Sequence, residues 1–508
     1  MRIGMKVIVT YSVETDLEIL RLIFEAVLND DKPSLCSAAR CCQAWKGPAL
    51  DLIWRRLPSA IPLLSLLPGF STENDTIVRP FDSAASIVVD PLYSDLTKQH
   101  KTCHLQPSSR IPFVSSISYT HRVLGDLKRI PLHFLDQVSN LESARIGARA
   151  IGEISLRMSL APRLRALALQ IGYAKSNPIS TTVYSVMSLL QGCSSLEQLS
   201  VRGHSSGCLD VPLSGISTLR SLSLHLSSLT EQSFMTVSAF PFLEYFDVHA
   251  DHLSQDFLSA AIPCSDHSTF FPALEKLKIR TQAALVALII QQLPRNKLRS
   301  LCVDVTGSAP SSTFDDLFKA MAPLPIHEFT LEYTISSEET PIYPVLTLEQ
   351  FRPLSKLPLR RCILDTSFPP DLSDAAIEEM VTWWPFLDRL ELGSSTALEN
   401  IETTWQPRIS MASLSTLARG CKHLKNLVIA LDLDLVHSVP DSDLDPPISH
   451  LTSLSISSRS RPDVPLLSTV LSRLFPSLRD VTPGFVGEHE GAWMAIQMNV
   501  LNLSRREF

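Results

Sequence analysis

The chain has 508 residues, of which 45% are hydrophobic and 19% are charged, and 45 Lys+Arg against 52 Asp+Glu give a net charge of -7. This composition excludes a largely disordered chain. The chain also lacks the cationic excess that is typical of proteins that bind nucleic acid or anionic membranes. The length exceeds that of one ordinary hydrophobic core, so several domains or an extended repeat are expected.

Targeting and cysteine patterns favour an intracellular protein. The apolar run Val7-Ile8-Val9 is too short for a signal peptide, and no apolar stretch reaches the roughly 20 residues of a membrane span. The ten cysteines show no C-x-x-C spacing, which argues against a disulfide framework or a thiolate zinc site. We therefore expect a soluble protein of the cytoplasm, the nucleus or both, with no cofactor.

After an N-terminal tail at 1–12, residues 13–58 predict a small domain of three helices. Apolar residues recur at helical spacing from Leu17 to Leu28, and Asn29-Asp30-Asp31 ends that helix. A second helix begins near Pro33, because proline suits a first helical turn, and Gly47-Pro48 ends it before the third. A domain this small buries little surface by itself, so it needs a partner or a neighbouring domain.

This segment resembles the divergent F-box found at the start of many fungal proteins. The matching elements are EILRLIF at 18–24, the Pro33-Ser34-Leu35 entry, the run ending in Trp45, and the helix at 48–57, whereas Thr15-Asp16 replaces the usual Leu-Pro. The resemblance implies docking on the small Skp-type adaptor of a cullin ubiquitin ligase. The residues that it implies as facing or supporting the adaptor are Leu20, Ile23, Phe24, Pro33, Leu35, Cys42 and Trp45. The alternative is a plain helical cap that closes the end of a solenoid.

Residues 59–135 are either a linker or degenerate first repeats, and residues 136–508 carry a repeated phrase. An apolar residue, two variable ones, an apolar, a variable and an apolar recur with a mean period of about 28 residues. The thirteen phrases begin at Leu141, Leu164, Leu196, Leu219, Leu243, Leu274, Leu298, Ile326, Leu359, Leu387, Leu424, Leu451 and Leu478.

Each phrase alternates apolar and variable residues at its end, as in a strand with one buried face. The segments 182–190, 234–239 and 375–383 have helical apolar spacing. Because such a strand cannot bury its face alone, stacked strand and helix units are expected, which is an α/β repeat solenoid. The phrases resemble those of the leucine-rich-repeat family, in an irregular form without the usual Asn or Cys, and this implies a horseshoe behind the three-helix domain.

In such a horseshoe the variable residues that flank the apolar residues of each strand project from the concave face. Two neighbouring rows combine aromatic, acidic and basic side chains and are the predicted target contacts: Tyr245, Asp247 and His249, and next to them Lys276, Lys278 and Arg280. The basic row suits an acidic or phosphorylated segment. The alternative is that these are ordinary solvated side chains.

Two motifs suggest chemistry but lack its context. Ser205 lies in a G-x-S-x-G motif, yet Pro212 follows where a hydrolase needs a helix. His249 and His252 with Cys264 and His267 have zinc-ligand spacing, without a supporting second cluster. No phosphate-binding glycine loop is present. No catalytic or metal-binding residue is therefore expected.

These patterns together predict a non-enzymatic, substrate-recognition subunit of a Skp/cullin/F-box ubiquitin ligase. Its expected partners are a Skp-type adaptor, through it a cullin, and an unidentified target protein, with no nucleic acid or membrane. The alternatives are a leucine-rich-repeat scaffold outside any ligase and a hydrolase that uses Ser205.

Overall fold

A computed structural model gives the fold of the chain. The residues that it describes are 23–24, 37, 45, 49, 52, 56–57, 71–73, 76–78, 116–118, 143–147, 164–172, 195–203, 209, 213–227, 229–261, 270–307, 309–333, 346–366, 369–393, 406–434, 449–484 and 489–504. No described helix is both long enough and apolar enough to span a bilayer.

The chain divides into two units, Met1–Leu219 and Arg220–Phe508. The described strands of the first unit are β1 (Arg56–Leu57), β2 (Ser71–Glu73), β3 (Thr76–Val78), β4 (Ser116–Ser118), β5 (Ser143–Gly147), β6 (Ala166–Gly172) and β7 (Gln198–Gly203). Strands β1, β4, β5, β6 and β7 lie side by side in that order and are parallel, while β2 pairs with β3 antiparallel. β4 lies within 59–135 and pairs with the first phrase strand.

The second unit repeats strand and helix in chain order. Its strands are β8 (Ser221–Leu226), β9 (Tyr245–His249), β10 (Lys276–Thr281), β11 (Ser300–Val305), β12 (Glu328–Tyr333), β13 (Arg361–Thr366), β14 (Arg389–Leu392), β15 (Asn426–Ala430), β16 (Ser453–Ser457) and β17 (Asp480–Pro483). Its helices are α10 (Glu231–Ser238), α11 (Gln255–Ala261), α12 (Ala283–Gln292), α13 (Ser311–Met321), α14 (Leu348–Phe351), the 3-10 helix η3 (Arg352–Lys356), α15 (Asp374–Trp383), α16 (Met411–Gly420), α17 (Val464–Leu474) and α18 (Glu490–Ser504).

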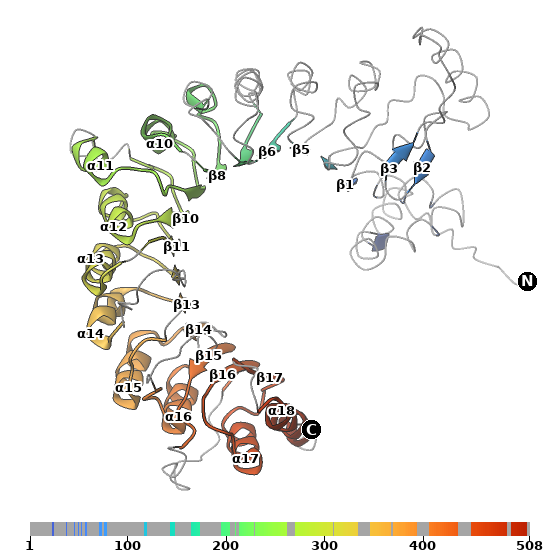
Figure 1. The fold of residues 1–508 in the computed structure, drawn as a ribbon, viewed down its shortest axis with the longest axis vertical. Helices are drawn as coiled ribbons and strands as arrows, with labels where there is room; N and C mark the ends of the chain where they lie inside the picture. The colour runs from blue at the N-terminus through green and yellow to red at the C-terminus, as the bar shows by residue number, and fades with distance from the viewer. Residues whose placement is uncertain are drawn as a thin grey trace, which may run out of the picture. The chain divides into compact units, whose positions relative to one another are not determined.

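Strands β8 to β17 form one layer, each pairing in parallel with the next in the chain. Figure 1 shows the strands of this unit on the inner side of a curve and helices α10 to α17 on its outer side. This arrangement is an α/β repeat, as the phrases predict.

Each of the thirteen predicted phrases coincides with one strand, from β5 to β17. The alternation is visible in β8, where Leu222 and Leu224 are buried and Ser223 between them is half-buried. The helices expected at 234–239 and 375–383 are confirmed as α10 and α15, whereas 182–190 lies outside the described residues.

The core of the second unit lies between the strands and the helices. The apolar residue that opens each phrase of this unit is buried, as at Leu243, Leu274 and Leu298. In the first repeats four phenylalanines pack together, and the ring centroids of Phe246 and Phe271 are 5.4 Å apart. Such aromatic pairs add to the stabilisation that burial of their area provides.

Several helices begin at a Ser or Thr that directly follows a buried apolar residue. Thr230, Ser373 and Ser410 each occupy the N-cap, and the hydroxyl accepts a hydrogen bond from a backbone N–H in the first turn. The cap of α16 is linked to the preceding repeat, because the Asp374 carboxylate accepts from the Ser410 N–H, the Ser410 hydroxyl and the Ser413 hydroxyl. Caps of this kind accept hydrogen bonds from backbone N–H groups of the first turn, which have no acceptor within the helix.

Several helices are followed directly by a buried aromatic residue and a proline. Pro385 follows Trp384, and Pro476 follows Phe475, at the ends of α15 and α17. Proline has no N–H to continue the helical pattern, so the chain turns and enters the next strand. In these repeats the proline separates the end of the helix from the strand that follows.

Candidate protein-binding surface

The six predicted target-contact residues lie side by side on β9 and β10. The register of these parallel strands pairs Tyr245 with Lys276, Asp247 with Lys278, and His249 with Arg280. The row alignment predicted from the phrases is therefore confirmed. Lys276 and Arg280 are exposed, and Tyr245, His249 and Lys278 are half-buried.

Asp247 differs from the other five residues, because it is only 8% exposed. Its Oδ2 contacts His225 Nε2 at 2.9 Å and accepts a 3.4 Å hydrogen bond from the Tyr245 hydroxyl. Burial opposes ionisation of Asp247, yet the hydrogen bond and attraction of His225, then those of Lys278 and His249, hold its pKa below the ordinary value. Asp247 is therefore a largely buried acceptor within this surface, and it is less accessible to a target than the other five residues.

The same contacts change Tyr245. Burial, and then the neighbouring Asp247 carboxylate, raise the pKa of Tyr245 to about 12. The hydroxyl is therefore a hydrogen-bond donor at neutral pH, and Tyr245 supports Asp247.

His225 and His249 stack on neighbouring strands. Their ring centroids are 4.4 Å apart and their planes differ by 10°. Burial, followed by the repulsion of His225 and Arg280, lowers the pKa of His249. Neutral His249 therefore fits this stack better than the protonated form.

Acidification is expected to destabilise this region through His249. A group whose pKa is lower in the folded state contributes stability above its unfolded pKa, about 6.5 for histidine, and loses it as the pH falls. The His249→Gln variant should therefore lose less stability than wild type between about pH 7.5 and pH 5. Urea-unfolding midpoints measured across this range test the effect. An equal decline in both proteins would contradict the role assigned to His249.

Ser223, His225 and Asp247 contain the residue types of a hydrolase triad, but their geometry does not form a relay. Ser223 Oγ is 3.3 Å from His225 Nε2, and Asp247 Oδ2 contacts that same nitrogen. A relay needs the hydroxyl and the carboxylate on different ring nitrogens. We therefore interpret the contacts among these three side chains as structural.

Arg280 is occupied by neighbouring carboxylates. Its Nε lies 3.6 Å from Asp251 and 3.7 Å from Asp304. Within the part of the chain that the structure describes, Lys276 and Lys278 form no ion pair, so they are the cations of this row that a target could contact.

Carboxylates dominate the following strands, a feature that the sequence reasoning did not select. Asp304, Glu332 and Asp365 occupy the same register position on β11, β12 and β13. Burial raises the pKa of Asp304, although Arg280 opposes this. Glu332 accepts a 3.6 Å hydrogen bond from the Cys302 thiol, and burial and then Glu332 raise the pKa of that thiol to about 12. The signal was available, because all three residues directly follow the last apolar residue of consecutive phrases.

Three of the seven predicted adaptor residues are described, and they lie on helical segments. Phe24 is buried, and its ring meets Trp45 edge-on with centroids 5.8 Å apart. Ile23 is 51% exposed and Trp45 is 39% exposed. The structure therefore brings Phe24 and Trp45 together and leaves Ile23 at the surface. Outside the described residues lie Leu20, Pro33, Leu35 and Cys42.

Two further candidates fall partly or wholly outside the described residues: Ser205, and the Cys264 and His267 half of the zinc motif. Among the described residues, no group of three or more His, Cys, Asp or Glu side chains is arranged to hold a metal ion.

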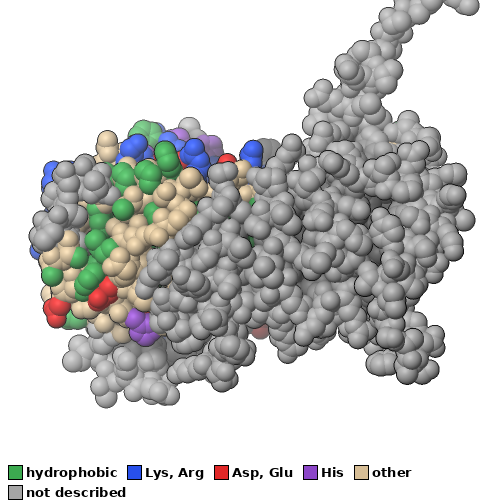
Figure 2. Space-filling view, turned by 90° about the horizontal axis from the view of Figure 1, so that it is seen from above, with side chains coloured by type: hydrophobic (Ala, Val, Ile, Leu, Met, Phe, Trp, Pro, Cys, Tyr) green, Lys and Arg blue, Asp and Glu red, His purple; other side chains and the backbone are tan. Residues whose placement is uncertain are grey.

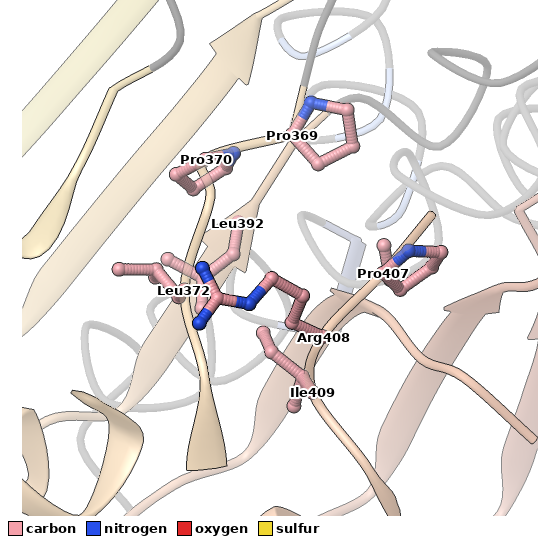
Figure 3. A pocket seen from close by; sticks show the side chains of 8 residues that line it. Pro369, Pro370, Leu372, Leu392, Pro407, Arg408 and Ile409 are labelled. Carbon is pink, nitrogen blue, oxygen red and sulfur yellow. The ribbon is translucent and has the colours of Figure 1, made fainter. Parts of the chain in front are cut away.

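A shallow pocket lies beside β14 and β15. Figure 3 shows side chains from the segments at 369–372 and 407–409 around it, together with Leu392. Arg408 pairs with Asp371 at 3.2 Å, and the pocket encloses no space for a water molecule. It offers no site for a small-molecule substrate.

Figure 2 shows one face of the molecule in space-filling form. In its described part, hydrophobic and uncharged side chains cover much of the area, and Lys and Arg gather along one edge. No broad patch of a single charge covers the described part of this face.

Comparisons with known proteins give structural matches only. No family model and no curated protein matches the chain. A chain of the yeast Rad7 and Elc1 complex matches with 15% identity and a TM-score of 0.35, over 88% of this chain and 93% of that one. A chain of the Drosophila Toll–Spatzle complex matches with 12% identity and a TM-score of 0.28, over 75% of this chain and 60% of that one. A Bacteroides fragilis protein matches with 10% identity and a TM-score of 0.26, over 80% and 88%. These values assign the chain to no family.

Proposed function

We propose that this chain is the target-binding subunit of a ubiquitin ligase. In this proposal the N-terminal helices bind a Skp-type adaptor, which connects the chain to a cullin, and the strand face of the repeats binds a target protein. The observation that carries the proposal is the strand face from β9 to β13. It presents half-buried and exposed charged side chains in register, which suits a protein ligand better than a small molecule.

The adaptor half of the proposal is supported by the packing at Ile23. Phe24 and Trp45 brace each other, so the neighbouring Ile23 side chain is held at the surface, where it is half exposed. An exposed aliphatic side chain beside a fixed aromatic pair suits docking to a second protein. The receptor itself carries out no chemistry in this proposal, and transfer of ubiquitin belongs to other subunits.

The Ile23→Glu variant tests this role. Burying a carboxylate in an apolar contact is unfavourable. We therefore expect the variant to retain at most about one tenth of the adaptor that wild type retains. The measurement is recovery of a recombinant Skp-type adaptor with the full-length chain. The matched control is Leu466→Glu, which places the same charge at an exposed aliphatic position of α17.

Two outcomes would overturn the proposal. The first is that wild type retains no adaptor, which would favour a protein-binding scaffold outside any ligase. The second is that Ile23→Glu and Leu466→Glu retain the adaptor equally, which would remove Ile23 from the contact.

A further inference from the structure

We propose that the strand face from β10 to β13 binds an extended target segment that carries one acidic and one basic side chain, about four to six residues apart. This inference deepens the proposed function and rests on the strand face as the target-binding surface. It does not depend on the adaptor. The face is bipolar, with cations at one end and carboxylates at the other.

The cationic end is formed by Lys276 and Lys278 on β10. Lys276 is exposed, Lys278 is half-buried, and the described structure gives neither an ion pair. The third cation of this strand, Arg280, is held by Asp251 and Asp304. An acidic side chain of a ligand would therefore contact the two lysines.

The anionic end is formed by Glu332 on β12 and Asp365 on β13. They are direct register partners, and like charges in that position repel. In the described structure their carboxylates form no ion pair, and Glu332 accepts a hydrogen bond from the neutral Cys302 thiol. A basic side chain from a ligand would relieve this repulsion.

At another register position of the same strands the charges already pair with each other. Glu328 on β12 pairs with Arg361 on β13 at 3.6 Å, so those charges offset each other. The register position between that pair and the carboxylates is uncharged on β11, β12 and β13, where it holds Cys302, Thr330 and Ile363. A ligand would thus meet charge at the two ends and a neutral strip in between.

The spacing follows from sheet geometry. β10 is two strands from β12 and three from β13, and strands lie about 4.8 Å apart, which gives roughly 10 to 14 Å across the sheet. In the register, Glu332 and Asp365 also lie two residues beyond Lys278 and four beyond Lys276, which adds roughly 7 to 13 Å along the strands and gives separations of roughly 12 to 20 Å. An extended chain advances about 3.3 Å per residue, so these distances correspond to about four to six residues. The carboxylates disfavour a nucleic-acid backbone at the same place, because its phosphates would face Glu332 and Asp365.

Designed peptides test the inference directly. The probes are fluorescein-labelled twelve-residue peptides of Gly, Ser and Ala with one Glu and one Lys, at separations from one to seven and in both orders. At low salt we expect peptides with a separation of about four to six to bind about fivefold tighter than those with a separation of one. Fluorescence anisotropy with the full chain gives the dissociation constants.

A charge swap tests which residues read the pattern. The Lys278→Glu, Glu332→Lys variant leaves the net charge unchanged and should favour the opposite order of Glu and Lys. The matched control, Glu328→Arg, Arg361→Glu, reverses the offset pair on the same strands and should keep the wild-type preference. Circular dichroism verifies that both variants are folded.

The inference is overturned if wild type shows no dependence on separation, if it binds all-Glu or all-Lys peptides at least as tightly, or if the swap variant keeps the wild-type order. These outcomes are distinct from the adaptor test. Adaptor binding without a spacing preference overturns only this inference, and a spacing preference without adaptor binding overturns only the ligase proposal.

Discussion

Replacing Phe246 by alanine is expected to lower the free energy of unfolding of the second unit by about 3–5 kcal/mol. Phe246 is fully buried on β9, and its ring contacts those of Phe234 and Phe271. Alanine would remove this contact area and leave a cavity that the rigid strand and helix layers fill only in part. Urea unfolding followed by circular dichroism measures the loss.

The matched control is Phe242→Ala, four residues earlier in the same repeat. Phe242 is 53% exposed, so its replacement should change the free energy of unfolding by about 0.5 kcal/mol or less. Similar losses for the two variants would contradict the placement of the aromatic core.

The Asp247→Ala variant is expected to lose about 2–3 kcal/mol of stability at neutral pH. Alanine removes the acceptor that His225 and Tyr245 share, and it leaves their polar groups half-buried without that partner. Asp247→Asn should lose less, because an amide oxygen can still accept one of these hydrogen bonds.

A double-mutant cycle separates the pair from other effects. Asp247→Ala combined with His225→Ala should show a coupling energy of about 1–2 kcal/mol. The cycle of Asp304→Ala with His225→Ala is the control, and it should be additive within about 0.5 kcal/mol because β9 and β10 separate the two residues. Additivity in the first cycle would mean that the His225 contact contributes nothing.

The strands were predictable because their signal is repeated. Each phrase carries apolar residues at fixed positions. A strand such as β10, in which buried Leu277 and Ile279 alternate with exposed or half-buried cationic residues, needs no information from elsewhere in the chain. The register followed too, since equal positions in successive phrases become neighbours.

The hydrogen-bond and ion-pair partners of side chains on the strand face were less predictable, because these partners lie on other strands or in loops. The burial of Asp247 depends on His225, one strand away, and Arg280 is held in part by Asp251, which follows β9 rather than belonging to a phrase. The carboxylates at Asp304, Glu332 and Asp365 each directly follow a phrase, and they form a pattern that runs across neighbouring strands instead of along one strand.

The hydrogen bonds of Asp374 limit how this protein can be divided. Its carboxylate belongs to the first turn of α15, but its three donors lie at the start of α16, in the next repeat. A fragment that ends before Ser410 would leave that carboxylate without these donors, and one that begins after Asp374 would lose the acceptor at the start of α16. Deletion mapping of a binding region should therefore place no boundary between these two helices, and repeats exchanged between related chains should be moved with both residues together.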